Sequence, residues 1–181
     1  MSDYTEYNGT WTIDPSHTRL GFIARHAMVT KVRGFFEDVA GTIVIDAANP
    51  SGSTANVAVQ LASINTGAAD RDAHLRSPDF FDVAVNKEMT FASTAVKQDG
   101  NEFIMVGDLT IKGVTQTVEL ELEPTGVVTD PFGSVRAGFE GQTEISRKDF
   151  GLTWNVALEA GGVLVSDKIK IQLDVAAVKS A

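Results

Sequence analysis

Apolar and polar residues alternate with a period of two over much of this chain. The clearest example is the segment 168–175 (KIKIQLDV), in which every second side chain is apolar. The same alternation occurs in residues 19–26, 56–61 and 117–123. Because successive side chains of a β-strand point to opposite faces, this period predicts strands that bury one face and expose the other.

Residues that favour turns separate these segments, as in 49–52 (NPSG), 99–100 (DG), 112–113 (KG) and 130–133 (DPFG). The short connections predict antiparallel neighbours. We expect about eight strands, the first two runs forming one bent strand, near residues 10–14, 18–27, 38–46, 54–62, 88–97, 102–112, 114–126, 133–146 and 163–178. Closing such a sheet removes its exposed edges and leaves an interior that holds packed side chains or one slender ligand.

Two segments break the alternation. Residues 66–83 contain a stretch that reads as one short helix followed by a second helical turn, and we expect Leu75, Phe80 and Phe81 to cap one mouth of the barrel. Residues 146–154 are also aromatic and irregular, which is typical of a loop or short helix at an opening. The predicted fold is therefore all-β with one or two short helices: an extended eight-stranded antiparallel lipocalin-like β-barrel.

The 181 residues fit one domain, with 43% hydrophobic and 22% charged residues. We expect residues 1–9 to be a flexible segment and residues 10–178 to form the barrel. The net charge of -9 disfavours binding to nucleic acid and to anionic membrane surfaces. The chain has no cysteine, which removes disulfides, thiolate metal sites and thiol nucleophiles.

No apolar stretch approaches the roughly 18 residues that cross a bilayer, so we expect no integral membrane segment. The first nine residues are polar and acidic and do not resemble a secretory signal, and the expected location is the cytoplasm.

The three histidines are spaced too far apart along the chain to indicate a metal site, and we predict none. His26 shares the predicted inner face with Phe22 if residues 19–26 alternate as a strand. His17 lies in the turn Asp14-Pro15-Ser16-His17, whose adjacent residues cannot align as nucleophile, base and orienter. We therefore predict no catalytic residues.

A barrel with many aromatic residues and many small inward residues has room left along its axis. Residues 24, 93, 107, 137 and 138 are alanine, serine or glycine at positions predicted to face inward. An apolar ligand would fill that room, because each buried methylene contributes about 0.8 kcal/mol. We predict an apolar tunnel lined by Phe22, Phe36, Leu75, Phe80, Phe81, Phe91, Phe150 and Trp154. The predicted contacts of a polar head group are His26, Arg71, His74 and Arg147, since guanidinium and imidazole groups bind anions.

Several motifs in order along the chain resemble the YceI-like family. They are WTIDPSH at 11–17, GFF at 34–36, NTG at 65–67, RD at 71–72, HLRSPDFFD at 74–82, MTFAS at 89–93, GDLTIKGVT at 107–115 and SRKDFG at 146–151. The resemblance covers roughly residues 10–178. It implies a lipocalin-related barrel that binds, stores or transports a polyisoprenoid or a related amphiphile, such as an isoprenoid quinone, with no further cofactor required. A homodimer is also an expectation from the resemblance, and some relatives are secreted to the periplasm.

Two alternatives remain open at this stage. The protein is an enzyme for a small lipophilic substrate if His26 or His74 acts as acid and base with Asp72 as orienter. It is a stress-associated structural protein if the barrel is fully packed.

Overall fold

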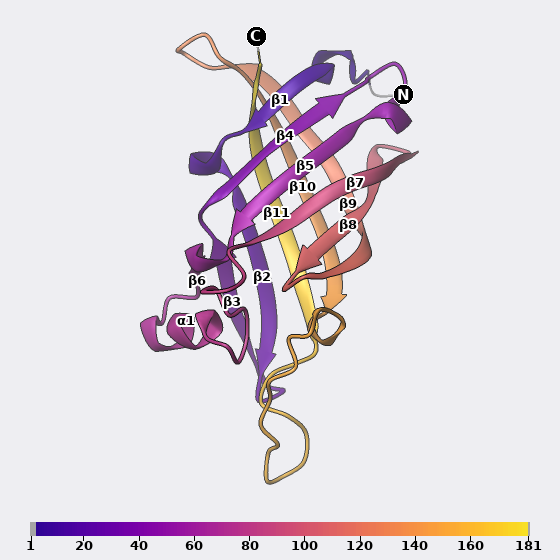
Figure 1. The fold of residues 1–181 in the computed structure, drawn as a ribbon. Helices are drawn as coiled ribbons and strands as arrows, with labels where there is room; N and C mark the ends of the chain where they lie inside the picture. The colour runs from indigo at the N-terminus through magenta and orange to yellow at the C-terminus, as the bar shows by residue number, and fades with distance from the viewer. Residues whose placement is uncertain (1–2, 181) are drawn as a thin grey trace.

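The computed structural model describes residues 3–180 as one antiparallel sheet of eleven strands that closes on itself (Figure 1). The strands are β1 (Gly9–Ile13), β2 (Arg19–His26), β3 (Thr30–Phe36), β4 (Val39–Ile45), β5 (Thr54–Gln60), β6 (Ile64–Asn65), β7 (Glu88–Asp99), β8 (Glu102–Ile111), β9 (Val114–Thr129), β10 (Val135–Ser146) and β11 (Lys168–Lys179). The helical elements are α1 (Ala69–Arg76) and the short 3-10 turns η1 (Thr5–Tyr7), η2 (Pro15–His17), η3 (Pro50–Gly52), η4 (Leu61–Ser63) and η5 (Arg147–Phe150).

The strands form a barrel of eight long strands. The order β1-β4-β5-β7-β8-β9-β10-β11 is closed by pairing between β1 and β11. β11 pairs with β1 through Ala177 and with β2 through Leu173, so β1 and β2 lie along the same edge of β11. In the same way, β3 and β4 follow one another along one edge, and β5 and β6 follow one another opposite them. This follows because β4 pairs with β5 and β3 pairs with β6. The predicted eight-stranded antiparallel barrel, including the bent first strand, is confirmed.

The bend between β1 and β2 has a local cause. Pro15 has no N–H to donate, and Asp14 accepts a hydrogen bond from the Ser16 N–H at 3.0 Å, which starts the short turn η2. Beyond the turn, the Thr18 hydroxyl replaces the missing strand contact: it donates to the Ala176 carbonyl oxygen at 3.2 Å and accepts from the Ala176 N–H at 3.1 Å. The chain therefore changes direction between β1 and β2 while both strands stay hydrogen-bonded to β11.

The sheet is not continuous at the end that carries α1. The strand order ends at β6, and the segment of residues 66–87 packs beside β3 and β6 (Figure 1). Phe81 donates its N–H to the Leu75 carbonyl oxygen at 3.0 Å, so the chain after α1 folds back on the helix. Leu75, Phe80 and Phe81 belong to the apolar clusters of the barrel interior. The segment thus closes this side with side chains instead of strand pairing.

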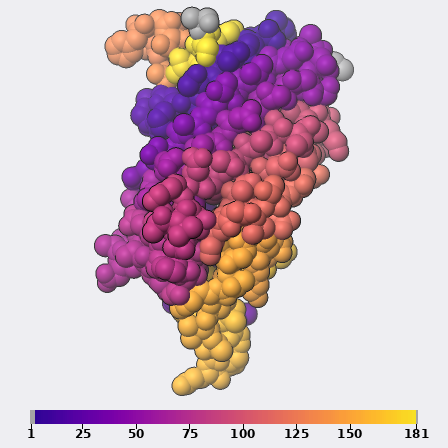
Figure 2. All heavy atoms as spheres, in the orientation of Figure 1, coloured from indigo at the N-terminus to yellow at the C-terminus, as the bar shows by residue number. Residues whose placement is uncertain are grey.

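Several boundaries differ from the expectation. β3 was not predicted as a strand, because Gly34 replaces an apolar side chain on its inner face and Phe35 lies outside, where the guanidinium carbon of Arg19 is 4.1 Å from the ring centroid. β11 begins at Lys168 and not near residue 163, because residues 151–167 form a loop that projects from one end of the molecule (Figures 1 and 2).

The opposite end of the barrel is packed around Trp11. Trp11 is fully buried, and its indole N–H donates to the Tyr7 carbonyl oxygen at 2.7 Å. Tyr7, Ala137 and Ala177 are buried beside it. Residues 5–9, part of the segment expected to be flexible, thus contribute a 3-10 turn and a buried tyrosine. Among the described residues, no helix has the length and apolar character to span a membrane.

Candidate functional site

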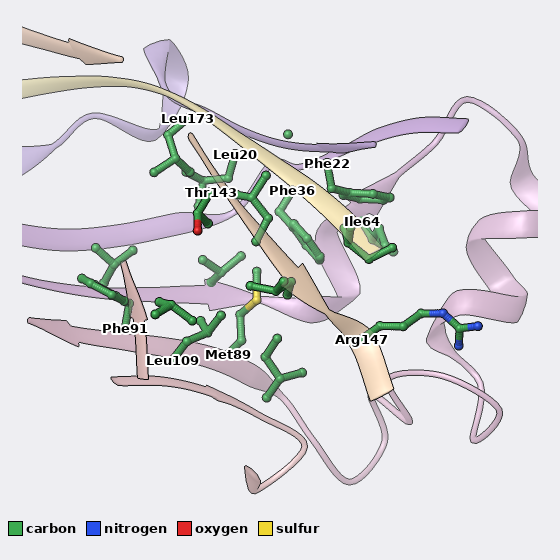
Figure 3. Close-up of a pocket in the computed structure, with 18 of the residues that line it drawn as sticks. Leu20, Phe22, Phe36, Ile64, Met89, Phe91, Leu109, Thr143, Arg147 and Leu173 are labelled. Atoms are coloured by element: carbon green, nitrogen blue, oxygen red, sulfur yellow. The ribbon is translucent and has the colours of Figure 1, made fainter. Parts of the chain in front are cut away.

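The barrel encloses an apolar cavity of about 230 Å³ in the half that carries α1 (Figure 3). Alternate positions of the strands supply its wall, as in Leu20, Phe22 and Ala24 of β2. Apart from Thr90, Thr143 and Arg147, every lining residue is apolar or glycine. An engineered apolar cavity of roughly 150 Å³ holds benzene. The cavity is therefore large enough for an apolar ligand, and the alternative of a fully packed barrel does not hold.

A second cavity of about 140 Å³ adjoins the first, nearer Tyr4, Tyr7 and Phe139. The two cavities share six lining residues: Ile13, Val57, Phe91, Leu120, Leu173 and Val175. They are thus neighbouring chambers along one apolar interior. A slender chain that passed from one chamber to the other would have to pass these six side chains.

The ring of Phe91 lies against Gly107 on the inner wall at this junction. A Cβ atom at position 107 would stand 2.6 Å from the Cε2 atom of Phe91 and 2.7 Å from the Ala92 carbonyl oxygen. Real Cβ atoms are not found that close to other heavy atoms. Glycine at position 107 thus allows the Phe91 ring to lie along the wall.

Six of the eight residues predicted to line the tunnel border the main cavity: Phe22, Phe36, Leu75, Phe80, Phe81 and Phe91. Phe150 and Trp154 do not. Phe150 is buried in the cluster behind the cavity wall, and the ring centroid of Trp154 lies 5.3 Å from that of Phe80. The prediction overlooked the aliphatic strand residues that make up most of the lining, although the period of two marks them, as in Ile169, Ile171 and Leu173.

Three of the four residues predicted to contact a head group lie outside the lining of both cavities. His26 is exposed at the end of β2, although Leu20, Phe22 and Ala24 of the same strand line the cavity. His74 pairs with Asp79 at 2.8 Å, and its ring lies edge-on to Trp154 with centroids 4.6 Å apart. These two positions are outside the inner wall.

Arg71, on α1, binds both the side chain and the backbone of Thr66. Arg71 donates from Nε to the Thr66 hydroxyl oxygen at 2.7 Å and from its terminal nitrogen to the Thr66 carbonyl oxygen at 2.8 Å. Asp72, which is buried, accepts the Thr66 N–H at 2.9 Å. These two side chains fix the start of the segment 66–87, and neither lines the main cavity.

Arg147 is the one head-group candidate at the cavity, at its end near the projecting loop (Figure 3). Its guanidinium points away from the apolar lining and donates four hydrogen bonds to carbonyl oxygens of both stems of the loop: Leu152 at 2.6 Å, Trp154 at 2.9 Å, Val165 at 3.1 Å and Ser166 at 2.8 Å. Burial lowers the pKa of Arg147, and Asp167 acts in the opposite direction. Four of its five N–H groups are thus used to hold the loop.

An Asp, His and Ser cluster does occur at η2, but it lacks the order of a catalytic triad. His17 Nδ1 lies 2.8 Å from Asp14 Oδ2 and 3.0 Å from Ser16 Oγ, so both partners meet the same ring nitrogen. A triad uses one nitrogen for each partner. Bonds from Ser16 and Arg136 hold the pKa of Asp14 far below its ordinary value, and the carboxylate therefore stays ionised as an anchor for the turn.

The enzyme alternative required an imidazole paired with a carboxylate inside the cavity. His74 is paired with Asp79 and not with Asp72, and this pair is outside the inner wall. Within residues 3–180, no three His, Asp or Glu side chains are grouped so that they could hold a metal ion. The main cavity offers apolar surface and the hydroxyls of Thr90 and Thr143 to a ligand.

Comparisons with known proteins agree with this architecture. A family model described as the YceI-like domain matches residues 11–177. Protein YceI of Escherichia coli O157:H7 is 42% identical over 136 residues, which cover 75% of this chain and 71% of that protein. The crystal structure of Campylobacter jejuni YCEI protein has a TM-score of 0.72 at 30% identity, covering 87% of this chain and 90% of that one.

A polyisoprenoid binding domain from Saccharophagus degradans also has a similar structure. Its TM-score is 0.68 at 16% identity, covering 94% of this chain and 98% of that one. Identity this low shows a shared fold alone.

Proposed function

The chain belongs to the YceI-like family, and from that premise and the apolar interior we propose that it binds a long-chain lipid of the polyisoprenoid type inside the barrel. The observation that carries the proposal is the pair of adjoining cavities, whose walls are almost wholly apolar. The polyisoprenoid binding domain of Saccharophagus degradans has the same fold and supports the choice of lipid class.

The energetics favour a ligand that is apolar along most of its length. Burial of a methylene-sized group contributes about 0.8 kcal/mol, and an isoprenoid chain repeats such groups many times. Ordering of the chain reduces the total. A polar or charged body would lose its hydration without gaining partners, because Thr90 and Thr143 are the uncharged hydrogen-bonding side chains of the main cavity. The polar end of the lipid therefore belongs at an opening.

The functional consequence is carriage or storage of the lipid and not its chemical conversion. Among residues 3–180, no paired acid and base lines the main cavity, and the one cation of its lining, Arg147, is engaged with loop carbonyls. We propose a polyisoprenoid or an isoprenoid quinone as the ligand.

Organic extraction of the purified protein followed by mass spectrometry tests the proposal. We expect a stoichiometric isoprenoid. Protein stripped of lipid by unfolding and refolding should gain thermal stability when an isoprenoid is added, because a ligand selective for the native state stabilises it. Recovery of no lipid, together with an unchanged melting temperature on addition of isoprenoids, would contradict the proposal.

Substitution of Phe91 localises the binding. Phe91→Trp enlarges a side chain at the junction of the two cavities, and we expect it to lower lipid occupancy while the barrel still folds. Phe132→Trp is the matched control, since Phe132 is 93% exposed on the hairpin between β9 and β10. Equal occupancy in both variants would place the ligand elsewhere.

A further inference from the structure

An exposed apolar tip forms the end of the molecule beyond the main cavity. We define the tip by Met28 and Val29 in the turn between β2 and β3, and Val156 and Val163 in the projecting loop. Their exposed fractions are 61%, 74%, 46% and 38%. The two parts of the tip are joined, because the Ala27 N–H donates to the Leu164 carbonyl oxygen at 2.7 Å and His26 forms a β-bridge with Val165.

The turn in this tip carries apolar residues where the backbone favours others. Ala27 and Met28 have φ angles of 50° and 63°, in the left-handed region. Glycine, asparagine and aspartate occupy such positions at lower cost. The sulfur of Met28 lies beside Gly162 of the projecting loop, but Met28 and Val29 remain 61% and 74% exposed. They indicate that the turn meets an apolar environment.

A basic surface lies beside the tip on the outer face of β3, β2 and β11. The strand register places Lys31 opposite Arg25, and Lys168 falls in the same row one strand further. Arg33 and Lys170 flank Ile23 in the next row. All five cations are exposed. Within residues 3–180, one of them makes an ion pair, from Lys168 to Glu144 at 3.3 Å.

Acidic side chains border this surface on one side: Glu144 stands opposite Lys170 in the strand register, and Lys170 lines a groove with Glu119, Glu121, Glu144 and Asp149. Glu159 is exposed on the loop, and Asp167 accepts hydrogen bonds from the Ser146 hydroxyl and the Lys148 N–H. Arg25, Lys31 and Arg33, on β2 and β3, lie outside that groove, and there the surface is basic despite the chain's net charge of -9. Salt screens charges beyond about 8–10 Å, so the charges nearest a binding partner decide the interaction. The repulsion expected from the net charge does not extend to this end.

The tip and the basic surface are built on the same strands as the main cavity. Ala24 of β2 and Ile169 of β11 line the cavity from the inner face, whereas Arg25 and Lys168 are on the outer face. Leu152 and Val165, at the stems of the projecting loop, line the main cavity. A surface bound to the tip would thus face the cavity across the base of the loop.

We propose that this end docks on an anionic lipid bilayer. The four tip side chains enter the boundary between head groups and acyl chains, and the five cations face the anionic head groups. The charge complementarity and the exposed apolar side chains at one end select a membrane as the partner. Exchange of lipid between bilayer and cavity is the consequence, and that part rests on the proposed function.

Sedimentation with vesicles tests the docking. We expect the protein to bind vesicles of phosphatidylcholine mixed with phosphatidylglycerol much better than vesicles of phosphatidylcholine alone, and raised salt should weaken the binding. Val29→Asp should lower binding at least fivefold. Val128→Asp is the matched control, because Val128 is 64% exposed at the opposite end of the barrel and should have no effect.

Charge reversal tests the basic surface. Each cation near an anionic membrane strengthens binding roughly fivefold, so Lys31→Glu should lower it by tenfold or more. Lys97→Glu changes the net charge equally on β7, away from this surface, and should have little effect. Melting temperatures close to that of the unchanged protein establish that the variants fold. Equal losses in test and control variants, or no preference for anionic vesicles, would overturn the proposal.

Two further measurements separate the docking from its alternatives. If the tip contacts a second copy of the chain, sedimentation velocity will show a dimer that Val29→Asp dissociates, without vesicle binding, and the proposal is wrong. Transfer of a fluorescent isoprenoid alcohol from vesicles is measured in parallel. Vesicle binding without transfer would count against the proposed function and leave the docking intact, whereas transfer without preference for anionic vesicles would refute the docking.

Discussion

Replacement of Arg147 by methionine tests what holds the projecting loop to the barrel. The guanidinium donates to carbonyl oxygens on both stems of the loop, at residues 152 and 154 on one side and 165 and 166 on the other. Methionine matches the stem of the arginine side chain but has no donor. The variant therefore removes all four hydrogen bonds while it leaves most of the apolar contact of the side chain in place.

The magnitude follows from two opposed contributions. A hydrogen bond to a charged group contributes about 1.5–3 kcal/mol, and Arg147 makes four of them. Burial of a cation costs several kcal/mol, and the charge of Asp167 offsets part of that cost. Methionine removes the gain and the cost together. The net loss of unfolding free energy should be about 2–4 kcal/mol.

Urea unfolding measures the global loss, and limited proteolysis with thermolysin reports the loop. The loop contains apolar residues such as Val156 and Leu158, which thermolysin cleaves when the backbone is accessible. We expect faster cleavage within residues 151–167 for Arg147→Met. Arg147→Lys should be intermediate, because a single ammonium group cannot span carbonyls on both stems.

The refuting result is specific. If Arg147→Met changes the unfolding free energy by less than about 0.5 kcal/mol, as an ordinary surface substitution does, and the loop is cleaved no faster, the four bonds do not hold the loop. If the variant instead keeps its stability but loses lipid, the guanidinium acts on the ligand as first predicted from the sequence.

Two further predictions concern the barrel wall and its pH dependence. Gly107→Ala places a Cβ against the Phe91 ring and the Ala92 carbonyl oxygen. We therefore expect the free energy of unfolding, measured in urea, to fall by about 1–3 kcal/mol, and lipid occupancy, measured by mass spectrometry, to fall as well. Unchanged values for both would show that the ring moves freely. Hydrogen bonds from Ser16 and Arg136 lower the pKa of Asp14, and Arg136 lowers that of Asp130, from an ordinary value of 3.8. The ionised carboxylates therefore stabilise the fold above that value, and the stabilisation is lost as the pH falls through the lower folded pKa. The difference in melting temperature between the unchanged protein and Arg136→Met should be largest near neutral pH and shrink in acid, and a constant difference would contradict this linkage.

The alternation of residue types was enough to predict the barrel, because a strand with one solvent-exposed face must place every second side chain in the interior. It failed at β3, where a glycine stands on the inner face and Phe35 lies outside against Arg19. It also failed at the projecting loop. Val163 and Val165 continue the apolar alternation of β11. In the loop, however, Val163 forms a β-bridge with Ala157, and Val165 donates its N–H to the Asn155 side-chain oxygen and bridges to His26 at the end of β2.

The head-group residues were harder to predict for a different reason. A sequence shows that arginine can bind an anion but not that backbone carbonyls satisfy it first, as they do for Arg71 and Arg147. His26 has the parity of an inward residue, yet it stands at the last position of its strand, where the barrel wall has ended. Parity predicts the face of a strand, whereas the depth along the barrel depends on long-range pairing.

The interior space has a more specific origin than the small residues in the sequence suggested. At two places a glycine on the inner wall lies beneath an aromatic ring from the neighbouring strand: Gly107 beneath Phe91, and Gly34 beneath Phe22. A Cβ atom at position 34 would stand 2.8 Å from the Cε1 atom of Phe22, so that ring too needs the glycine in order to lie along the wall. The glycines therefore leave room indirectly, because they let large rings lie flat and keep the barrel axis open. It follows that alanine at either position should reduce the space for a ligand by more than the volume of one methyl group, since it displaces a whole ring toward the axis.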